Sequence, residues 1–169
     1  HGTACASVIK KECSNIEIYS FGILDKHGIC NLEMLEATLL YIESEDIDLI
    51  NLSLAIETNV NVKDLHAICK KIQKNGKIVI TSLGNNMRKS YPAIFKECIG
   101  VRGYILDNID ALWFNKNKKI QCVLDSTPFL HCNLEGTYSM FGKCNSYAAA
   151  KLTGIIASIL NENSNITKE

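Results

Sequence analysis

The sequence predicts an α/β fold built on a mostly parallel sheet. Residues 47–55 (IDLINLSLA) and 77–83 (KIVITSL) are nearly continuous apolar runs of the length that buried strands have. Segments 32–45 and 62–75 carry apolar residues at helical spacing, and the connections between all four segments are short. Strands that alternate with helices in this way are joined by right-handed crossovers into a parallel sheet with helices on its faces.

The first third of the chain supplies three of the expected elements. Residues 3–13 are expected to form a helix with small residues on a closely packed face. Residues 16–24 (IEIYSFGIL) are rich in β-branched and aromatic side chains, which favours a buried strand. Asn31 is placed to cap the helix over 32–45, because an asparagine side chain can accept a hydrogen bond from a free amide at the helix start.

The helix expected over residues 62–75 has signals at both of its ends. Asn61 can cap it, Asp64 lies near the positive end of the helix dipole, and lysines lie toward the negative end. Gly76 is a natural terminator, since glycine readily adopts the left-handed conformation that ends many helices.

Beyond Gly84 the pattern changes. Residues 98–105, 111–115 and 119–124 are short strand candidates with no helical pattern between them. A loop is expected around Pro128 and Gly136, and it leads into a last helix that begins near Ser146. No repeat, linker or low-complexity tract divides residues 1–169, so they are expected to form one domain or part of one.

Composition narrows the classes of function. The 18 Lys and Arg residues balance the 18 Asp and Glu residues, and the small lysine clusters do not amount to a nucleic-acid-binding surface. No apolar run reaches the length of roughly 20 residues that a membrane-spanning helix needs, and no signal peptide opens the chain. Because the sequence begins inside an element, we expect its true N-terminus to be missing.

The cysteines are expected to be free. There are eight of them, with no CxxC pair, and the apolar content is sufficient for a core without disulfides. The close ligand pairs typical of zinc sites are absent, so no metal site is expected. Free thiols favour a reducing, cytoplasmic location, while a secreted protein stays open as the alternative because the N-terminus is missing.

Polar residues gather where the expected strands end and the expected helices begin. In an open parallel sheet these positions meet at one rim, which brings together His1, residues 53–55, residues 82–85 and Ser146. A nucleophilic serine needs a base and donors for the oxyanion. His1 could be that base, Ser146 the nucleophile, and the Asn85 amide with the Ser146 backbone N–H the two donors.

An ordered set of motifs resembles the subtilisin-like serine proteases, the subtilases, from their catalytic histidine onward. HGTACASVI is similar to the family's HGTHVAG helix, INLSLA to INMSLG, and VITSLGNN to VAAAGNE. YPAIFKECIGVRGY is similar to YPA…VIAVGA, and GKCNSYAAAKLTGIIASIL to GTSMASPHVAGAAAL. These segments cover essentially the whole sequence in the family's order.

The resemblance implies a fold, a reaction and a set of site residues. The fold would be a subtilisin-like three-layer sandwich with a mostly parallel central sheet that lacks its N-terminal part. The reaction would be hydrolysis of peptide bonds in a peptide or protein substrate, with no cofactor, and with a structural calcium ion left open. His1 would be the general base, Ser146 the nucleophile and Asn85 the oxyanion-hole side chain. The implied substrate-binding residues are Ser53, Leu54 and Ala55 at one strand end and Ser82, Leu83 and Gly84 at the next.

Two departures from the family pattern leave two hypotheses open. The family's orienting aspartate lies upstream of the histidine, and Asp25 falls in a later segment, so the triad acid is not assigned. Cys144 and Asn145 replace the Gly-Thr that precedes the serine. The chain is therefore expected to be an endopeptidase whose site is completed by an N-terminal segment or another chain, or a degenerate module that binds a peptide or partner without cleaving it. An unrelated α/β ligand-binding domain is disfavoured because no glycine-rich phosphate loop follows an early strand.

Overall fold

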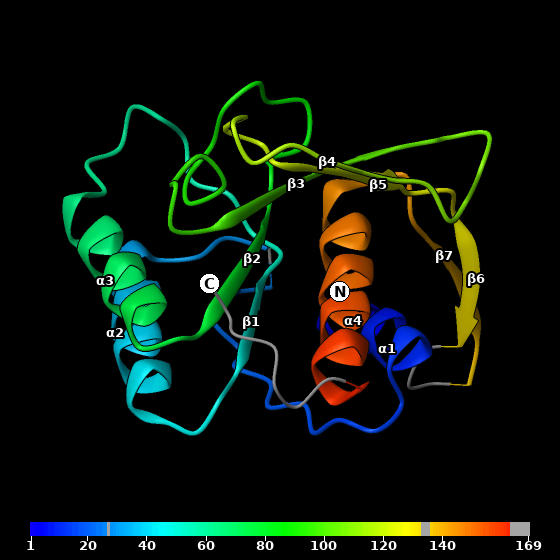
Figure 1. The fold of residues 1–169 in the computed structure, drawn as a ribbon, viewed down its shortest axis with the longest axis horizontal. Coiled ribbons are helices and arrows are strands. Elements are labelled where there is room, and N and C mark those ends of the chain that lie inside the picture. Colours follow the sequence, from blue (N-terminus) through cyan, green and yellow to red (C-terminus); the bar gives the residue numbers. More distant parts are fainter. Residues whose placement is uncertain (27, 133–135, 163–169) are drawn as a thin grey trace.

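A five-stranded sheet forms the centre of the computed structural model, which describes residues 1–26, 28–132 and 136–162 (Figure 1). Four of its strands are parallel: β1 (Leu49–Leu52), β2 (Ile78–Ser82), β3 (Ile99–Tyr104) and β5 (Cys122–Asp125). β4 (Leu112–Phe114) pairs antiparallel with β5, and the order across the sheet is β1-β2-β3-β5-β4. The carboxyl ends of the four parallel strands therefore lie at one rim.

Helices cover both faces of this sheet, as Figure 1 shows. α2 (Leu32–Ser44) and α3 (Lys63–Lys74) enclose one core with β1 and β2, which includes Leu35, Leu65 and Val79. On the other face α4 (Asn145–Glu162) buries Ala148 and Leu152 against the sheet, and α1 (Gly2–Glu12) packs on α4. The predicted α/β sandwich with a mostly parallel sheet is confirmed.

Two residues predicted to mark helix ends, Asn31 and Gly76, do so in the structure. The Asn31 side chain accepts a hydrogen bond from the Glu33 amide at 2.8 Å and caps α2. Gly76 has a φ of 76°, and its amide and that of Lys77 bond to the carbonyls of Gln73 and Ile72 to end α3. The capping position of α3, however, is Val62; Asn61 stands one residue earlier and accepts from the Lys63 amide at 3.3 Å.

The strand predicted over residues 16–24 is wrong. This segment has no strand hydrogen bonding beyond an isolated bridge between Leu24 and Cys30. A β-branched sequence becomes a strand only where another strand offers its backbone groups. Residues 16–24 face β1 across a cavity, and β1 is the last strand of the described sheet on that side.

The loop predicted around Pro128 and Gly136 contains regular structure instead. β6 (Phe129–Cys132) and β7 (Tyr138–Phe141) form an antiparallel pair apart from the main sheet, with Phe129 opposite Phe141. Pro128 immediately precedes β6 and Gly136 lies between the two strands, so these turn-forming residues favoured the prediction of a loop over that of two short strands.

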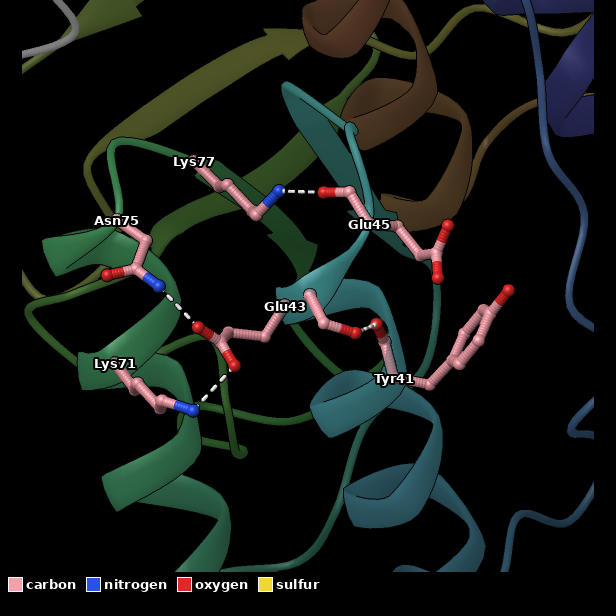
Figure 2. A network of polar contacts seen from close by, with 7 residues as sticks. Tyr41, Glu43, Glu45, Lys71, Asn75 and Lys77 are labelled. Atoms are coloured by element: carbon pink, nitrogen blue, oxygen red, sulfur yellow. Dashed lines mark hydrogen bonds and ion pairs between the residues drawn. The ribbon is translucent and has the colours of Figure 1, made fainter.

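Polar contacts join the ends of α2 and α3 on the face away from α4 (Figure 2). Lys71 forms an ion pair with Glu43 at 2.6 Å, and Asn75 donates to the same carboxylate. The Lys77 ammonium group donates to the carbonyls of Glu45 and Ile47, the latter at 3.0 Å. These contacts fix the two helices to the start of β1 and lie far from the rim discussed below.

α1 and α4 cross at a glycine. A Cβ atom at Gly154 would lie 2.6 Å from the Glu12 Cβ and 2.8 Å from the Ile9 carbonyl oxygen, so only a glycine permits this approach. At the other end, the Phe141 ring contacts both the His1 ring and the Tyr147 ring at 5.9 Å. The two helices thus run in the same direction, with their N-termini at one end.

Candidate active site

The first turn of α4 carries Ser146. The helix begins at Asn145, so the amides of its first residues have no partner within the helix and point toward the rim of the sheet. Ser146 is buried, with 7% of its surface exposed. Its hydroxyl and backbone N–H therefore lie at the positive end of a long helix, where negative charge is stabilised.

Asn85 is held against this helix start. Its side-chain Oδ1 accepts a hydrogen bond from the Asn145 amide at 3.2 Å. The Asn85 loop is closed by the Met87 amide, which bonds to the Gly84 carbonyl at 3.0 Å, and by the Ser90 hydroxyl, which accepts from the Gly84 amide at 2.9 Å. With Oδ1 engaged, the amide group Nδ2 of the exposed Asn85 is the part of the side chain left to donate to a ligand.

The Asn145 side chain joins three segments of the rim. Its Oδ1 accepts a hydrogen bond of 2.9 Å from the amide of Gly103, which lies near the C-terminal end of β3. Its Nδ2 donates to the carbonyls of Leu83 at 2.8 Å and Gly84 at 3.4 Å, just after β2. Gly103 is also packed tightly, since a Cβ there would lie 2.8 Å from the Ser126 Cβ and 3.0 Å from the Cys144 carbonyl oxygen.

His1 caps α1 and lies at the same end of the molecule as Ser146. Its ring is exposed and meets Phe141 edge to face. Within the described ranges, no hydrogen bond joins the His1 ring to Ser146 or to a carboxylate. The structure thus brings the predicted base and nucleophile to one end of a helix pair but does not connect them directly.

A chain of polar groups that sequence reasoning missed runs beneath His1. The Cys5 Sγ lies 3.9 Å from the His1 Nδ1 and 3.6 Å from the Ser53 hydroxyl, to which it donates. Asn51 donates to the same hydroxyl at 3.2 Å and accepts from Thr153 of α4 at 3.2 Å. α1, β1 and α4 are thereby linked below the rim.

Burial raises the pKa of the Cys5 thiol, and the hydrogen bond to Ser53 offsets part of that effect. The thiol is consequently protonated at neutral pH. A protonated thiol is a poor nucleophile, so Cys5 is not positioned to compete with Ser146.

The two segments predicted to bind substrate lie next to each other. Ala55 is exposed and Ser53 and Leu54 are half-buried, whereas Ser82, Leu83 and Gly84 are buried. A Cβ at Gly84 would lie 3.1 Å from the Ala55 Cβ, which shows how closely the two strand ends approach. The two strand ends that were expected to meet at one rim therefore lie side by side in the structure.

A cavity of about 640 Å³ lies beside His1. The outer edge of β1 forms one side of it, residues 15–24 form the opposite side, and α1, α2 and α4 contribute the remainder. Leu39, Ile50 and Leu52 make much of this lining apolar. Proteins usually cover or interrupt an exposed strand edge, which makes an open edge beside a cavity of this size unusual.

Asp125, at the end of β5, is a second polar centre that the sequence did not reveal. It accepts from the Leu106 amide and the Thr127 amide, each at 2.9 Å, and from the Thr127 hydroxyl at 2.8 Å. Burial alone would raise the pKa of Asp125, but these hydrogen bonds and the charge of Lys151 on α4 lower it overall. The carboxylate stays ionised and fixes the loops that follow β3 and β5.

Two kinds of feature are absent from the described part of the chain. No group of three or more His, Cys, Asp and Glu side chains is arranged to hold a metal ion. None of the helices there combines the length and the apolar character that a bilayer crossing requires.

The fold is that of subtilisin-like proteases. A solved structure of sphericase matches with a TM-score of 0.70 at 14% sequence identity, covering 86% of this chain and 55% of that protein. The S41 psychrophilic protease matches with a TM-score of 0.68 at 13% identity and the same coverage. This chain thus spans about half the length of the structures that it resembles.

The sequence model of the subtilase family, Peptidase_S8, matches residues 1–169. The chain therefore belongs to the subtilase family. No curated protein sequence matches it closely enough to count as a relative.

Proposed function

We propose that this chain carries the histidine, serine and asparagine of a subtilisin-like serine endopeptidase. The observation that supports this most directly is the hydrogen bond of 3.2 Å between the Asn145 amide and the Asn85 Oδ1, because it sets an asparagine side chain beside the Ser146 amide at a helix N-terminus. Two donors at such a position suit the oxyanion of a tetrahedral intermediate.

The proposed reaction follows the two stages of acyl transfer. His1 accepts the proton of the Ser146 hydroxyl as its oxygen attacks the carbonyl carbon of the scissile bond. The Ser146 N–H and the Asn85 Nδ2 donate to the oxygen that becomes negative. His1 then gives the proton to the leaving amine, and water hydrolyses the acyl ester by the same route. The proposed reaction uses no cofactor.

The substrate would lie along the strand ends beside this site. Backbone groups of Ser53, Leu54 and Ala55 would pair with an extended peptide, because an exposed strand end offers free amides and carbonyls. Ser82, Leu83 and Gly84 would form the inner wall of the pocket for the side chain that precedes the scissile bond. A peptide or protein is the substrate that such pairing selects.

The acid that orients His1 is proposed to come from outside residues 1–169, either from the same polypeptide or from another chain. The cavity beside β1 supports this, because it is open along the strand edge and reaches both His1 and Cys5. A strand that paired with this edge could carry a carboxylate toward the His1 Nδ1. That carboxylate would fix the tautomer and orientation of the imidazole.

The test is covalent labelling of the full-length protein with a fluorophosphonate probe, followed by mapping of the labelled residue. Labelling at Ser146, and its loss in Ser146→Ala, is the expected result. The Ser146→Ala protein must keep the thermal unfolding temperature of the wild type. A folded wild-type protein that takes up no label at Ser146 would falsify the endopeptidase proposal.

A second candidate is peptide binding without cleavage. It draws on the lack of a hydrogen bond between His1 and Ser146 in the described residues and on the Cys144-Asn145 pair before the serine. In that case the full-length protein would bind peptides along residues 53–55, and a peptide library would stay intact. Cleavage that disappears in Ser146→Ala rules this candidate out.

A further inference from the structure

We infer that Asn145 is a positioning residue that sets the oxyanion site, acting through Asn85 and the first turn of α4. This inference rests on the proposed function. Asn145 does not itself face the substrate, because both ends of its side chain are occupied. Its effect would come from holding three backbone segments and one side chain in fixed relation.

The first step of the argument is the burial of Asn145 and the use of its polar atoms. The residue is 8% exposed, and a buried amide is costly unless its groups find partners. The Oδ1 receives the Gly103 amide at 2.9 Å, and the Nδ2 reaches the Leu83 and Gly84 carbonyls at 2.8 and 3.4 Å. The side chain therefore joins the ends of β2 and β3 to α4.

The second step is the chemistry that these three partners require. One partner is a donor and two are acceptors, so the side chain must offer an acceptor and a donor at once, as an amide does. A carboxylate of the same shape could still accept from Gly103. It would, however, set negative oxygens against the carbonyls of Leu83 and Gly84, and this repulsion would push the helix start away from β2.

The third step connects the hydrogen bonds of the Asn145 side chain with Gly103, Leu83 and Gly84, which we call the Asn145 clamp, to the proposed oxyanion donors. The Asn145 amide holds the Asn85 Oδ1 at 3.2 Å, which fixes the orientation of the Asn85 side chain and leaves its Nδ2 to donate. The next amide along the chain belongs to Ser146 itself. A shift of Asn145 would consequently displace both proposed donors together, and catalysis is sensitive to displacements of about 1 Å.

A simpler role for Asn145 predicts the opposite result for one substitution. If the residue only stabilised the start of α4, Asn145→Asp would be tolerated or favourable, because acidic side chains are stabilising at a helix N-terminus. The Asn145 clamp instead predicts that Asn145→Asp lowers kcat. Asn31→Asp is the matched control, because Asn31 caps α2 on the other face of the sheet with a single accepted hydrogen bond.

The experiment measures kcat and KM of the full-length protein with a peptide substrate. Asn145→Asp is expected to lower kcat about 10- to 100-fold, part of the loss that follows removal of an oxyanion donor, with KM changed by no more than about threefold. Asn31→Asp is expected to leave both constants unchanged. In an Asn85→Ala background, Asn145→Asp should cost less than it does in the wild type, because the part of its effect that acts through Asn85 is already lost and only the displacement of the Ser146 amide remains. A wild-type kcat in Asn145→Asp, or fully additive losses, would overturn the inference.

A second readout separates this inference from the proposed function. The side-chain NH₂ group of Asn85 gives a pair of signals in ¹H–¹⁵N spectra. They should be sharp and distinct in the wild type, and broadened or shifted in Asn145→Asp and in Asn145→Ala, which introduces no charge. Unchanged Asn85 signals in a folded variant reject the clamp. This measurement decides the matter even if Ser146 proves unreactive toward the probe.

Discussion

The two sides of the proposed site differ in how completely the described residues support them. On the side of α4, β2 and β3, Asn85, Asn145 and Gly103 are joined by direct hydrogen bonds of 2.9 to 3.2 Å. On the side of α1 and β1, His1 has a thiol at 3.9 Å as its polar neighbour and a large cavity beside it. We call these the oxyanion side and the base side.

This difference supports the proposal that the described residues specify the oxyanion side by themselves, whereas the base side is completed by a group from outside residues 1–169. The proposed donors are the Ser146 backbone N–H and the Asn85 side chain, and both are held in place once α4 packs against the sheet. A general base needs a third group to orient it, and orientation by a carboxylate requires another strand or loop. The predictions below test this contrast in order of decreasing effect.

The largest effect is expected from removing one group on each side. His1→Ala should lower kcat of the full-length enzyme by about 10⁴- to 10⁶-fold, because no other described residue is placed to take the serine proton. Asn85→Ala should lower it by about 10²- to 10³-fold, because the Ser146 amide remains as a donor. Steady-state kinetics with a peptide substrate provide the comparison. Equal losses in the two variants would contradict the assigned roles.

A pair of glycines tests how tightly the two sides are packed. Gly103→Ala on the oxyanion side would force a Cβ to within 2.8 Å of the Ser126 Cβ, and should lower the free energy of unfolding by about 1–3 kcal/mol. Gly22→Ala is the control on the base side, where an added Cβ meets nothing within 4 Å. Its effect should stay within about 0.5 kcal/mol or be slightly stabilising. Urea unfolding measures both, and a destabilised Gly22→Ala protein would show that the base side is packed as tightly.

Acid should loosen the oxyanion side through Asp125. The pKa of this carboxyl is lowered in the folded protein, so its ionised form stabilises the fold above the pKa of the unfolded chain, about 4. That stabilisation is lost as the pH falls through the lower, folded value. Asp125→Asn should therefore cost about 1–2 kcal/mol at pH 7, and the difference from the wild type should shrink below pH 4. Chemical unfolding at several pH values checks the sign; a difference that grows in acid would refute it.

The smallest effect concerns the reactivity of Cys5 on the base side. Because burial raises the pKa of this thiol, its alkylation by iodoacetamide at pH 7 should be slow compared with the same cysteine in urea-unfolded protein. The rate in the folded state should rise with pH above 9. Mass spectrometry of Cys5 peptides follows the reaction, and a rate equal to that of the unfolded chain would mean that the thiol is accessible and ionised.

The sequence predicted the parts of the fold in which local signals and tertiary context agree. The apolar runs around Ile50 and Val79 are buried strands, and Asn31 and Gly76 mark helix ends as their chemistry requires. Residues 16–24 have a strand-forming sequence but no strand beside them, so a local propensity was not realised. The cap of α3 moved by one residue, an error within the usual spread of helix boundaries.

Only part of the proposed site could be proposed from the sequence. His1, Asn85 and Ser146 stand out because their types and order match a known chemistry. The role of Asn145 could not be read from the sequence, because it depends on Leu83, Gly84 and Gly103, which the chain brings together only in three dimensions. The same holds for Cys5, Asn51 and Thr153, whose hydrogen bonds link three elements that are distant along the chain.

α1 and α4 cross at Gly154, and from this crossing both helices extend toward the end of the molecule that carries the proposed site. Ile9 and Gly154 meet at the crossing. Ile9 lies eight residues after His1, and Gly154 lies eight residues after Ser146. At a rise of 1.5 Å per residue each of these helix segments is about 12 Å long, so a change of about 10° in the crossing angle would change the separation of the two helix ends by about 2 Å. The distance between the proposed base and the proposed nucleophile therefore depends in part on the angle of a helix crossing that contacts neither residue.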